Sequence, residues 1–474
     1  MMQTRWNRYM FYAFFIAANM YAAQGPNQVT GVVTNTLDTF HETWIMVFSP
    51  DGLKCYISNY NVGTVDVIDV ATNTVTATVA GQYGTPTGLA LSNDGTQLYI
   101  ADYDASMVWI VDTTADPIII NGSVGTTDAE TLFFSNPNSL QMTPDGTTMY
   151  VNNNNDPSNI VVIDTNPQSG NYNNIVTQVT GTSFTNSQLM AITPDGAYLY
   201  VTDDSDYFVA IIDTQSNAQV GTVDDTNYPF NTPYAIAITP DGLKAYVANE
   251  YGSVNNTGSV AIIDLDSSSE TYNKVIGLVD DPDQTMAYPW YLSILPSGET
   301  VYVVNYGDVN DNEGSVSMVD VATNRVTGLI TDLNPITIYY PDAMGITPDG
   351  SKLYISNYGE QVSVVGFGIL PPRNLAGTSM KNSFLTQINL INVISFDPPL
   401  QGEVPIAYNV YTDADLRQRI KTITNQSTLP VEGTFVYLDP LLQYNTTYTY
   451  YITSIDRYGN ESGPATISIT TLPR

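Results

Sequence analysis

Short runs of apolar, aromatic and β-branched residues recur along the first three quarters of the chain and predict β-strands. The clearest pair covers residues 234–239 and 244–249. Between them, Pro240-Asp241-Gly242 has the chemistry of a tight turn, because proline presets φ and glycine accepts the left-handed conformation. Two further apolar runs, at residues 259–264 and 274–279, complete a unit of four predicted strands. Four strands per repeat is the composition of a propeller blade.

The turn recurs along the chain and defines seven units with loops of unequal length. The turns are Pro50-Asp51-Gly52, Asn93-Asp94-Gly95, Pro144-Asp145-Gly146, Pro194-Asp195-Gly196, Pro240-Asp241-Gly242, Pro296-Ser297-Gly298 and Pro348-Asp349-Gly350. In six units the third predicted strand ends on an aspartate: Asp69, Asp112, Asp164, Asp213, Asp264 and Asp320. We interpret these aspartates as local acceptors for backbone amides rather than as catalysts.

The second strand of most units ends on asparagine after an aromatic and β-branched core. It reads YISN at 56–59 and 354–357, YVNN at 150–153, YVAN at 246–249 and YVVN at 302–305. Together with the turn, these strands resemble the YVTN β-propeller repeat family, also described as surface-layer-protein-like. The resemblance implies a seven-bladed propeller. It implies less about activity, since that family contains binding proteins and uncharacterised surface proteins, and neighbouring propeller families include enzymes.

The segment before the first unit predicts how the ring closes. Residues 28–34 read QVTGVVT and match residues 325–331, RVTGLIT, a fourth strand of the sixth unit. The seventh unit supplies only three strands of its own. We therefore predict a seven-bladed β-propeller over residues 28–369 that the N-terminal strand closes, which removes the free sheet edge.

Residues 1–23 resemble a secretory signal peptide. Arg5 and Arg8 precede an apolar run at 10–18, and small residues precede Gln24. The run is short for a bilayer span, although a retained N-terminal anchor stays open as the alternative. The predicted location is secreted, periplasmic or cell-surface, with no membrane-spanning segment in the mature chain. The single cysteine, Cys55, lies within a strand and is predicted to be a buried, inert thiol.

Residues 370–474 change character after a proline-containing linker. Six predicted strand runs suit an immunoglobulin-like β-sandwich. The segment resembles a fibronectin type III domain at Phe396-Asp397-Pro398-Pro399, at the spacing of Leu442 and Tyr448, and at residues 456–462. Phe396 stands where that family usually has tryptophan. The predicted fold class is thus all-β, a seven-bladed propeller followed by a sandwich that serves as a spacer or a second interaction module.

Composition excludes one class of partner. The formal net charge is −33, from 47 acidic and only 14 basic residues. Because phosphate recognition requires clustered basic side chains, nucleic acid is not an expected partner.

Aromatic residues concentrate in the loops that a propeller places on one face, between blades and between second and third strands. A protein or a glycan at the cell surface is the predicted partner of this face. The alternative that these residues only cap strand ends stays open. The candidates are Tyr60, Tyr103, Tyr207, Tyr251, Tyr288, Trp290, Tyr306, Tyr340 and Tyr358.

Residues 308–314, DVNDNEG, offer a candidate calcium loop. Asp308, Asn310 and Asn312 place oxygen ligands at alternating positions. The glycine comes one place late for an EF-hand, and the twelfth position has no glutamate. Zinc and copper are disfavoured, since His41 and Cys55 are the only residues of their kinds.

A catalytic alternative places a divalent metal in the propeller channel. Propeller lactonases hold such a metal with Glu, Asp and Asn, so a likeness to them would implicate Glu42, Asp342 and Asn138. The leading hypothesis is a non-catalytic protein-binding or glycan-binding or surface-layer-associated protein; the alternative is a lactonase-like hydrolase or lyase. About three to five carboxylate or amide oxygens that converge on one point in the channel would favour the enzyme. A channel plugged with apolar and hydroxyl side chains would favour binding.

Overall fold

The computed structural model describes most of the chain after the N-terminal segment. It covers residues 28–473 apart from residues 36–39, 41, 81–83, 125–133, 155–157, 182–183, 225–226, 252–257, 284, 308–313, 332–337, 339, 359–360, 367–372, 385–386, 399–404, 414–416, 425–434, 456–461 and 463. The predicted signal peptide lies outside the described residues. Among those that are described, no helix has the length and apolar character needed to cross a membrane.

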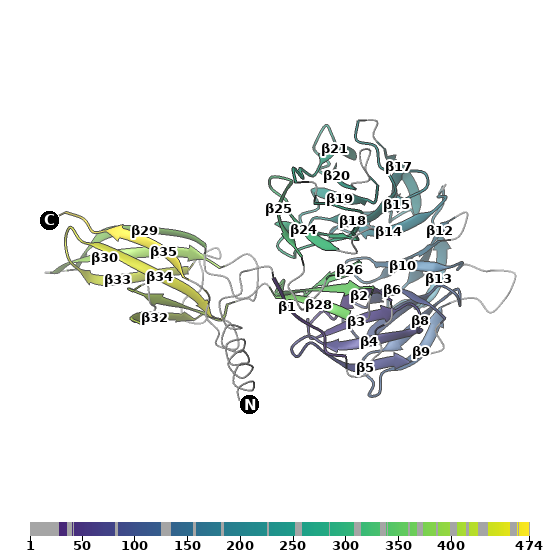
Figure 1. Ribbon diagram of the computed structural model, residues 1–474, viewed down its shortest axis with the longest axis horizontal. Helices are drawn as coiled ribbons and strands as arrows, with labels where there is room; N and C mark the ends of the chain where they lie inside the picture. Colours follow the sequence, from purple (N-terminus) through teal and green to yellow (C-terminus); the bar gives the residue numbers. More distant parts are fainter. Residues whose placement is uncertain are drawn as a thin grey trace, which may run out of the picture.

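Seven four-stranded antiparallel sheets form a ring, consistent with a seven-bladed propeller (Figure 1). We number the sheets one to seven by their innermost strands, which are β2 (Thr43–Phe48), β6 (Pro86–Leu91), β10 (Pro137–Met142), β14 (Ser187–Ile192), β18 (Pro233–Ile238), β22 (Pro289–Ile294) and β26 (Pro341–Ile346). Each innermost strand contacts the next one, and β26 contacts β2, so the ring is closed.

The outer strands follow in the same order in each sheet. The second strands are β3 (Lys54–Asn59), β7 (Gln97–Asp102), β11 (Thr148–Asn153), β15 (Tyr198–Asp203), β19 (Lys244–Asn249), β23 (Thr300–Asn305) and β27 (Lys352–Asn357). The third strands are β4 (Thr64–Asp69), β8 (Met107–Asp112), β12 (Asn159–Asp164), β16 (Phe208–Asp213), β20 (Ser259–Asp264), β24 (Ser315–Asp320) and β28 (Gln361–Gly366). The fourth strands are β5 (Thr74–Ala80), β9 (Ile119–Val124), β13 (Asn174–Gln178), β17 (Ala218–Val223), β21 (Lys274–Leu278), β25 (Arg325–Ile330) and β1 (Gln28–Val32).

The seventh sheet combines both ends of the ring. Strand β1 pairs antiparallel with β28, with Gln28 opposite Gly366 and Val32 opposite Ser363. The outer edge of the last sheet is therefore covered by the first strand of the chain, which fixes the ring in its closed form.

An apolar cluster fills each interface between neighbouring sheets. Between sheets four and five, for example, Val209 and Ile211 pack against Val247 and Ile263, all nearly inaccessible to water. The remaining interfaces have equivalent clusters. Cys55 belongs to the cluster between sheets seven and one, where burial raises the pKa of its thiol, as expected for an inert cysteine.

Polar side chains lock the turns and join neighbouring sheets. All six aspartates that end third strands accept a backbone amide from the following turn, which confirms their interpretation as local acceptors. Second-strand tyrosines donate to asparagines in the next sheet, across 2.5 to 2.8 Å. The five pairs are Tyr99 with Asn173, Tyr150 with Asn217, Tyr200 with Asn273, Tyr246 with Asn324, and Tyr354 with Asn73. Each asparagine has a positive φ, a conformation that asparagine tolerates better than most residues.

The C-terminal part contains two further sheets. One orders β29 (Arg373–Phe384), β30 (Gln387–Asp397) and β33 (Phe435–Leu442); the other orders β32 (Arg419–Thr424), β31 (Ala407–Tyr411), β34 (Thr447–Ile455) and β35 (Ala465–Thr470). Both sheets contribute to one apolar cluster, in which Phe396 lies 5.0 Å from Tyr408 and 5.8 Å from Phe435 between ring centroids. Strand β29 was not predicted, because its sequence, RNLAGTSMKNSF, is dominated by glycine and polar residues.

Candidate functional site

One backbone hydrogen bond, repeated in all seven sheets, builds the face opposite the tight turns. The residue that follows the second strand donates its N–H to the carbonyl of the residue just before the innermost strand, across 2.9 to 3.2 Å. We call these two sets of seven residues the rim. The pairs are Tyr60 with Glu42, Tyr103 with Thr85, Asn154 with Asn136, Asp204 with Asn186, Glu250 with Thr232, Tyr306 with Tyr288, and Tyr358 with Tyr340.

Buried side chains at the ends of the second strands hold the rim in place. All seven are Asn or Asp and are at most 1% exposed: Asn59, Asp102, Asn153, Asp203, Asn249, Asn305 and Asn357. In sheet two, the Asp102 carboxylate accepts the amides of Gly84, Thr85 and Ala105 and the indole N–H of Trp109. Asp203 likewise accepts the amides of Thr185 and Asn186 before its sheet and those of Ser205 and Asp206 after its second strand, so each aspartate ties the loop before a sheet to the loop within it. Asn59 and Asn305 instead donate to side chains of the third strand.

Five rim residues have left-handed backbones although none is glycine. Their φ angles are 48° for Glu42, 54° for Asn136, 54° for Thr232, 52° for Tyr288 and 42° for Tyr340. For bulky residues this conformation costs on the order of 1 kcal/mol or more, and such residues cluster at functional sites. The propeller-like ring of sheets thus holds the backbone in a costly conformation at the same position of five sheets.

A β-bulge in every innermost strand adds a third set of side chains at the channel mouth. The register between first and second strands shifts just after the first residue, so the next residue lacks a cross-strand partner. A bulge re-aims the side chain it releases. The seven bulge residues are Trp44, Thr87, Asn138, Gln188, Tyr234, Trp290 and Asp342.

Aromatic residues occupy one side of the rim and bulge sets. Between ring centroids, Tyr234 lies 3.9 Å from Trp290, Trp290 lies 6.0 Å from Tyr306, and Tyr306 lies 4.9 Å from Tyr340. Tyr340 is 6.4 Å from Tyr358. Sheets five, six and seven thereby form a continuous row of five rings, whereas sheets three and four present Asn, Gln and Asp at the same positions.

This row borders a cavity of about 480 Å³, which we call the aromatic cavity. Six aromatic residues and three carboxylates line it, with one glycine: Glu42, Trp44, Glu250, Tyr251, Tyr288, Trp290, Tyr306, Gly307, Asp342 and Tyr358. Tyr251 and Tyr358 are 41% and 47% exposed, so the opening reaches solvent. The volume is in the range of small-molecule sites.

The carboxylates of the aromatic cavity differ in burial: Asp342 is buried, whereas Glu42 and Glu250 are half-buried. Asp342 is only 9% exposed, and burial together with the nearby Glu42 raises its pKa to about 7. In the described part of the chain, no side chain or amide donates a hydrogen bond to its carboxylate. Burial also raises the pKa of Glu250, against the opposing effect of a hydrogen bond with Tyr251. The lining of the cavity therefore combines acidic groups of raised pKa with aromatic side chains.

The hollow between the innermost strands has a different lining. It measures about 290 Å³ and is bordered mainly by Ile, Leu, Val, Met and Ala, together with Ser139, Gln141 and Tyr291. Glu42 and Asp342 lie outside it, at the mouth. Asn138, the third residue of the catalytic alternative, accepts a hydrogen bond from the Asn152 side chain at 3.0 Å. Where side chains are described, no three His, Cys, Asp or Glu residues are grouped to hold a metal. The predicted calcium loop of Asp308, Asn310 and Asn312, and His41, lie outside the described residues.

The nine aromatic candidates do not all come together. Tyr251, Tyr288, Trp290, Tyr306 and Tyr358 line the aromatic cavity, and Tyr340 stacks on Tyr306. Tyr60 lies 5.6 Å from Trp44, ring to ring, whereas Tyr103 belongs to the rim of sheet two and is not among the cavity residues. Tyr207 is 48% exposed and lies outside the cavity.

Trp44 and Tyr234 were missed by sequence reasoning. Aligning the innermost strands TWIMVF, PYAIAI, PWYLSI and PDAMGI would have placed them beside Trp290 and Asp342 at the second position.

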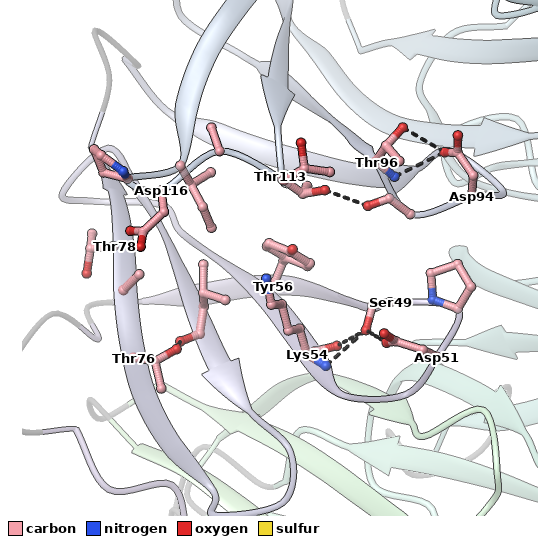
Figure 2. Close-up of a pocket in the computed structure, with 18 residues that line it drawn as sticks. Ser49, Asp51, Lys54, Tyr56, Thr76, Thr78, Asp94, Thr96, Thr113 and Asp116 are labelled. Atoms are coloured by element: carbon pink, nitrogen blue, oxygen red, sulfur yellow. Dashed lines mark hydrogen bonds between the residues drawn. The ribbon is translucent and has the colours of Figure 1, made fainter.

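A larger hollow, about 690 Å³, lies on the opposite face between sheets one and two (Figure 2). Figure 2 shows Tyr56 and Lys54 facing the turn that contains Thr113 and Asp116. This turn, TTADPI, has no asparagine to meet Tyr56, unlike the turns that accept the five tyrosines described above. Asp51 accepts from Ser49 and Asp94 from Thr96, so these carboxylates serve their own turns. We interpret this hollow as a gap in sheet packing.

No protein-family model and no curated protein matches this chain. A solved structure described as Kuenenia stuttgartiensis hydrazine synthase aligns with 69% of this chain and 96% of that chain, with a TM-score of 0.55 and 20% sequence identity. At this identity the similarity concerns the fold alone, and it agrees with the repeated four-stranded sheets.

Proposed function

We propose that the chain is an exported propeller of the YVTN repeat type that binds a protein or a glycan at the cell surface without catalysis, through the aromatic cavity. The observation that carries this proposal is the row of neighbouring aromatic rings from Tyr234 to Tyr358, some stacked and some tilted or edge to face, beside an open cavity. Rigid aromatic side chains give large contact areas at small entropic cost and dominate recognition surfaces.

The chemistry of the channel supports binding over the hydrolase alternative. A metal-dependent hydrolase needs several oxygen or nitrogen ligands around one point. Glu42 and Asp342 form a pair at the mouth, but apolar side chains border most of the hollow beneath them, and Asn138 is engaged by Asn152. Surface-layer association fits the same proposal, with the ring as the recognition unit.

We propose further that residues 370–474 form a fibronectin type III-like domain that acts as a spacer or second interaction module. The shared cluster around Phe396 supports this assignment. So does the Tyr448 hydroxyl, which accepts the Gln443 amide at 3.1 Å, six residues after Leu442. Limited proteolysis that releases a stable fragment beginning near residue 370 would test it.

Co-sedimentation with cell envelopes of the producing organism tests the binding function. The Trp290→Ala variant should lose at least about tenfold in affinity, because Trp290 stacks on Tyr234 and borders the cavity. The exposed Tyr207→Ala variant is the matched control and should bind as the parent does. Metal-dependent hydrolysis of a lactone that disappears in Asp342→Asn would overturn the proposal in favour of the enzyme.

A further inference from the structure

The chemistry of the aromatic cavity points to one ligand group. Resting on the proposed binding function, we propose that the cavity recognises an organic ammonium group, held between aromatic faces and above the carboxylates of Glu42, Glu250 and Asp342.

Aromatic rings supply the walls. Six of the ten residues that line the cavity are Trp or Tyr, from sheets one, five, six and seven. Their orientations differ: Tyr251 and Tyr288 meet edge to face at 89°, whereas Tyr306 and Tyr340 are stacked at 29°. Aromatic residues in several orientations around one cavity are the kind of lining that recognises quaternary ammonium ligands through cation–π contacts.

The carboxylates are the charged side chains of the cavity lining, so all of its charges are negative. Three carboxylates line the cavity, and none of its lining residues is Lys, Arg, His, Asn or Gln. A carboxylate only accepts hydrogen bonds, so the lining offers many acceptors and, apart from tyrosine hydroxyls, indole N–H groups and the backbone, no donors. An alkylammonium group requires no hydrogen-bond donor from its site, and the carboxylates place full negative charges opposite it.

Asp342 gives the strongest single indication that the ligand is a cation. Its carboxylate is about nine-tenths buried, borders the cavity and is met by no described hydrogen-bond donor. The nearest charge to influence it is Glu42, of the same sign. A buried anion without a partner is costly, and a bound cation would supply the missing charge.

The Asp342 carboxylate and the indoles of Trp44 and Trp290 come from the same position of the repeat. Trp44, Trp290 and Asp342 are all bulge residues, released from their strands at the same depth of the ring. The bulges thereby bring two indoles and one carboxylate to a common level at the channel mouth. A ligand that touches one of them there lies within reach of the others.

Calorimetric titration of the mature chain with choline tests the proposal, with 3,3-dimethylbutan-1-ol as the probe of equal shape and no charge. We expect one choline site at pH 8 and low salt, with the neutral analogue at least about tenfold weaker. Asp342→Asn and Trp290→Ala should each weaken choline at least about tenfold. The exposed Asp283→Asn variant removes one charge outside the cavity and should leave binding unchanged. Asparagine has nearly the same size and shape as aspartate. A melting temperature of Asp342→Asn no lower than that of the parent would therefore show that weaker choline binding does not result from unfolding.

Two ammonium sources are distinguished by a second titration, with an acetylated trimethyl-lysine amide. Choline binding alone indicates a small free cation, and binding of the lysine derivative alone indicates the side chain of a partner protein. Equal binding of choline and its neutral analogue would overturn the ammonium assignment while leaving the cavity a binding site. Saccharide binding lost in Trp290→Ala, with no binding of either cation, would also overturn it and keep the broader function. Failure of Trp290→Ala to alter envelope binding would instead remove the proposed function itself.

Discussion

Acidic residues occur on both faces of the ring, but their environments shift their pKa values in opposite directions. On the turn face, Asp51, Asp94 and Asp145 each accept a hydroxyl and a backbone amide within their own turn, and these hydrogen bonds lower their pKa values. At the rim and the channel mouth, burial raises the pKa of Glu250 and Asp342. Each of these turn acids thus accepts several hydrogen bonds, whereas Asp342 at the mouth is buried with no donor among the described residues.

This difference between the two faces explains which positions of the repeat keep the same residue type in nearly every sheet and which do not. A turn aspartate is fixed by the local hydrogen bonds that it satisfies, so six of the seven turns keep it. A rim position makes a backbone hydrogen bond that does not involve its side chain, although five rim residues also adopt a left-handed backbone. The side chains there are free to differ from sheet to sheet, and one side of the ring has become aromatic.

The largest effect should come from removing the buried anchor of a rim loop. Asp102→Ala removes the acceptor of the amides of Gly84, Thr85 and Ala105, so we expect a loss of about 3–5 kcal/mol in the free energy of unfolding. The exposed turn residue Asp145→Ala should lose about 1 kcal/mol or less, because water replaces its bonds. Urea unfolding of both variants measures the contrast. Equal losses would mean that the rim and the turns depend on their acids to the same degree.

A smaller and pH-dependent effect is expected at Asp342, whose pKa is raised by burial and by the nearby Glu42. Its pKa is about 7 in the folded chain against an ordinary value of 3.8, so the folded state binds more protons between these pH values. Stability contributed through this group therefore falls as pH rises from about 4 to 7 and changes little above. Relative to the parent, Asp342→Asn should gain roughly 2–4 kcal/mol at pH 8 and far less at pH 4.

Urea unfolding of parent and variant at both pH values gives this difference. A gain that does not depend on pH would show that the Asp342 carboxyl has the same pKa in the folded and the unfolded chain, and it would contradict the prediction. Choline at saturating concentration should reduce the gain at pH 8, because a bound cation stabilises the ionised carboxylate of the parent alone.

The repeat made most of the ring predictable. Tyr246 and Asn249, at fixed places after Pro240-Asp241-Gly242, mark a second strand, and the match of residues 28–34 with 325–331 locates the strand that pairs with β28. These signals are local, because strand alternation and turn chemistry operate over a few residues. Strand β29 lacks both signals, and its place follows from long-range pairing with β30.

The composition of the cavity was less predictable from the loops alone. Tyr207 and Tyr251 both follow a second strand closely, yet only Tyr251 borders the cavity. Trp44 lies inside a strand and points to the mouth because a bulge releases it. Which tyrosines converge depends on bulges and on left-handed residues such as Tyr288, and these are settled by contacts between sheets.

The smallest expected effect concerns the links between sheets. Asn324 accepts the Tyr246 hydroxyl at 2.6 Å and the Lys244 ammonium at 3.2 Å, with its backbone at a φ of 53°. Asn324→Ala removes both bonds and places alanine in a left-handed conformation, so we expect a loss of about 2 kcal/mol. Asn324→Gly keeps the conformation and should lose about 1 kcal/mol through the bonds alone. Because this link lies on the turn face, choline affinity should not change in either variant; a change would show that the two faces are coupled through the sheet.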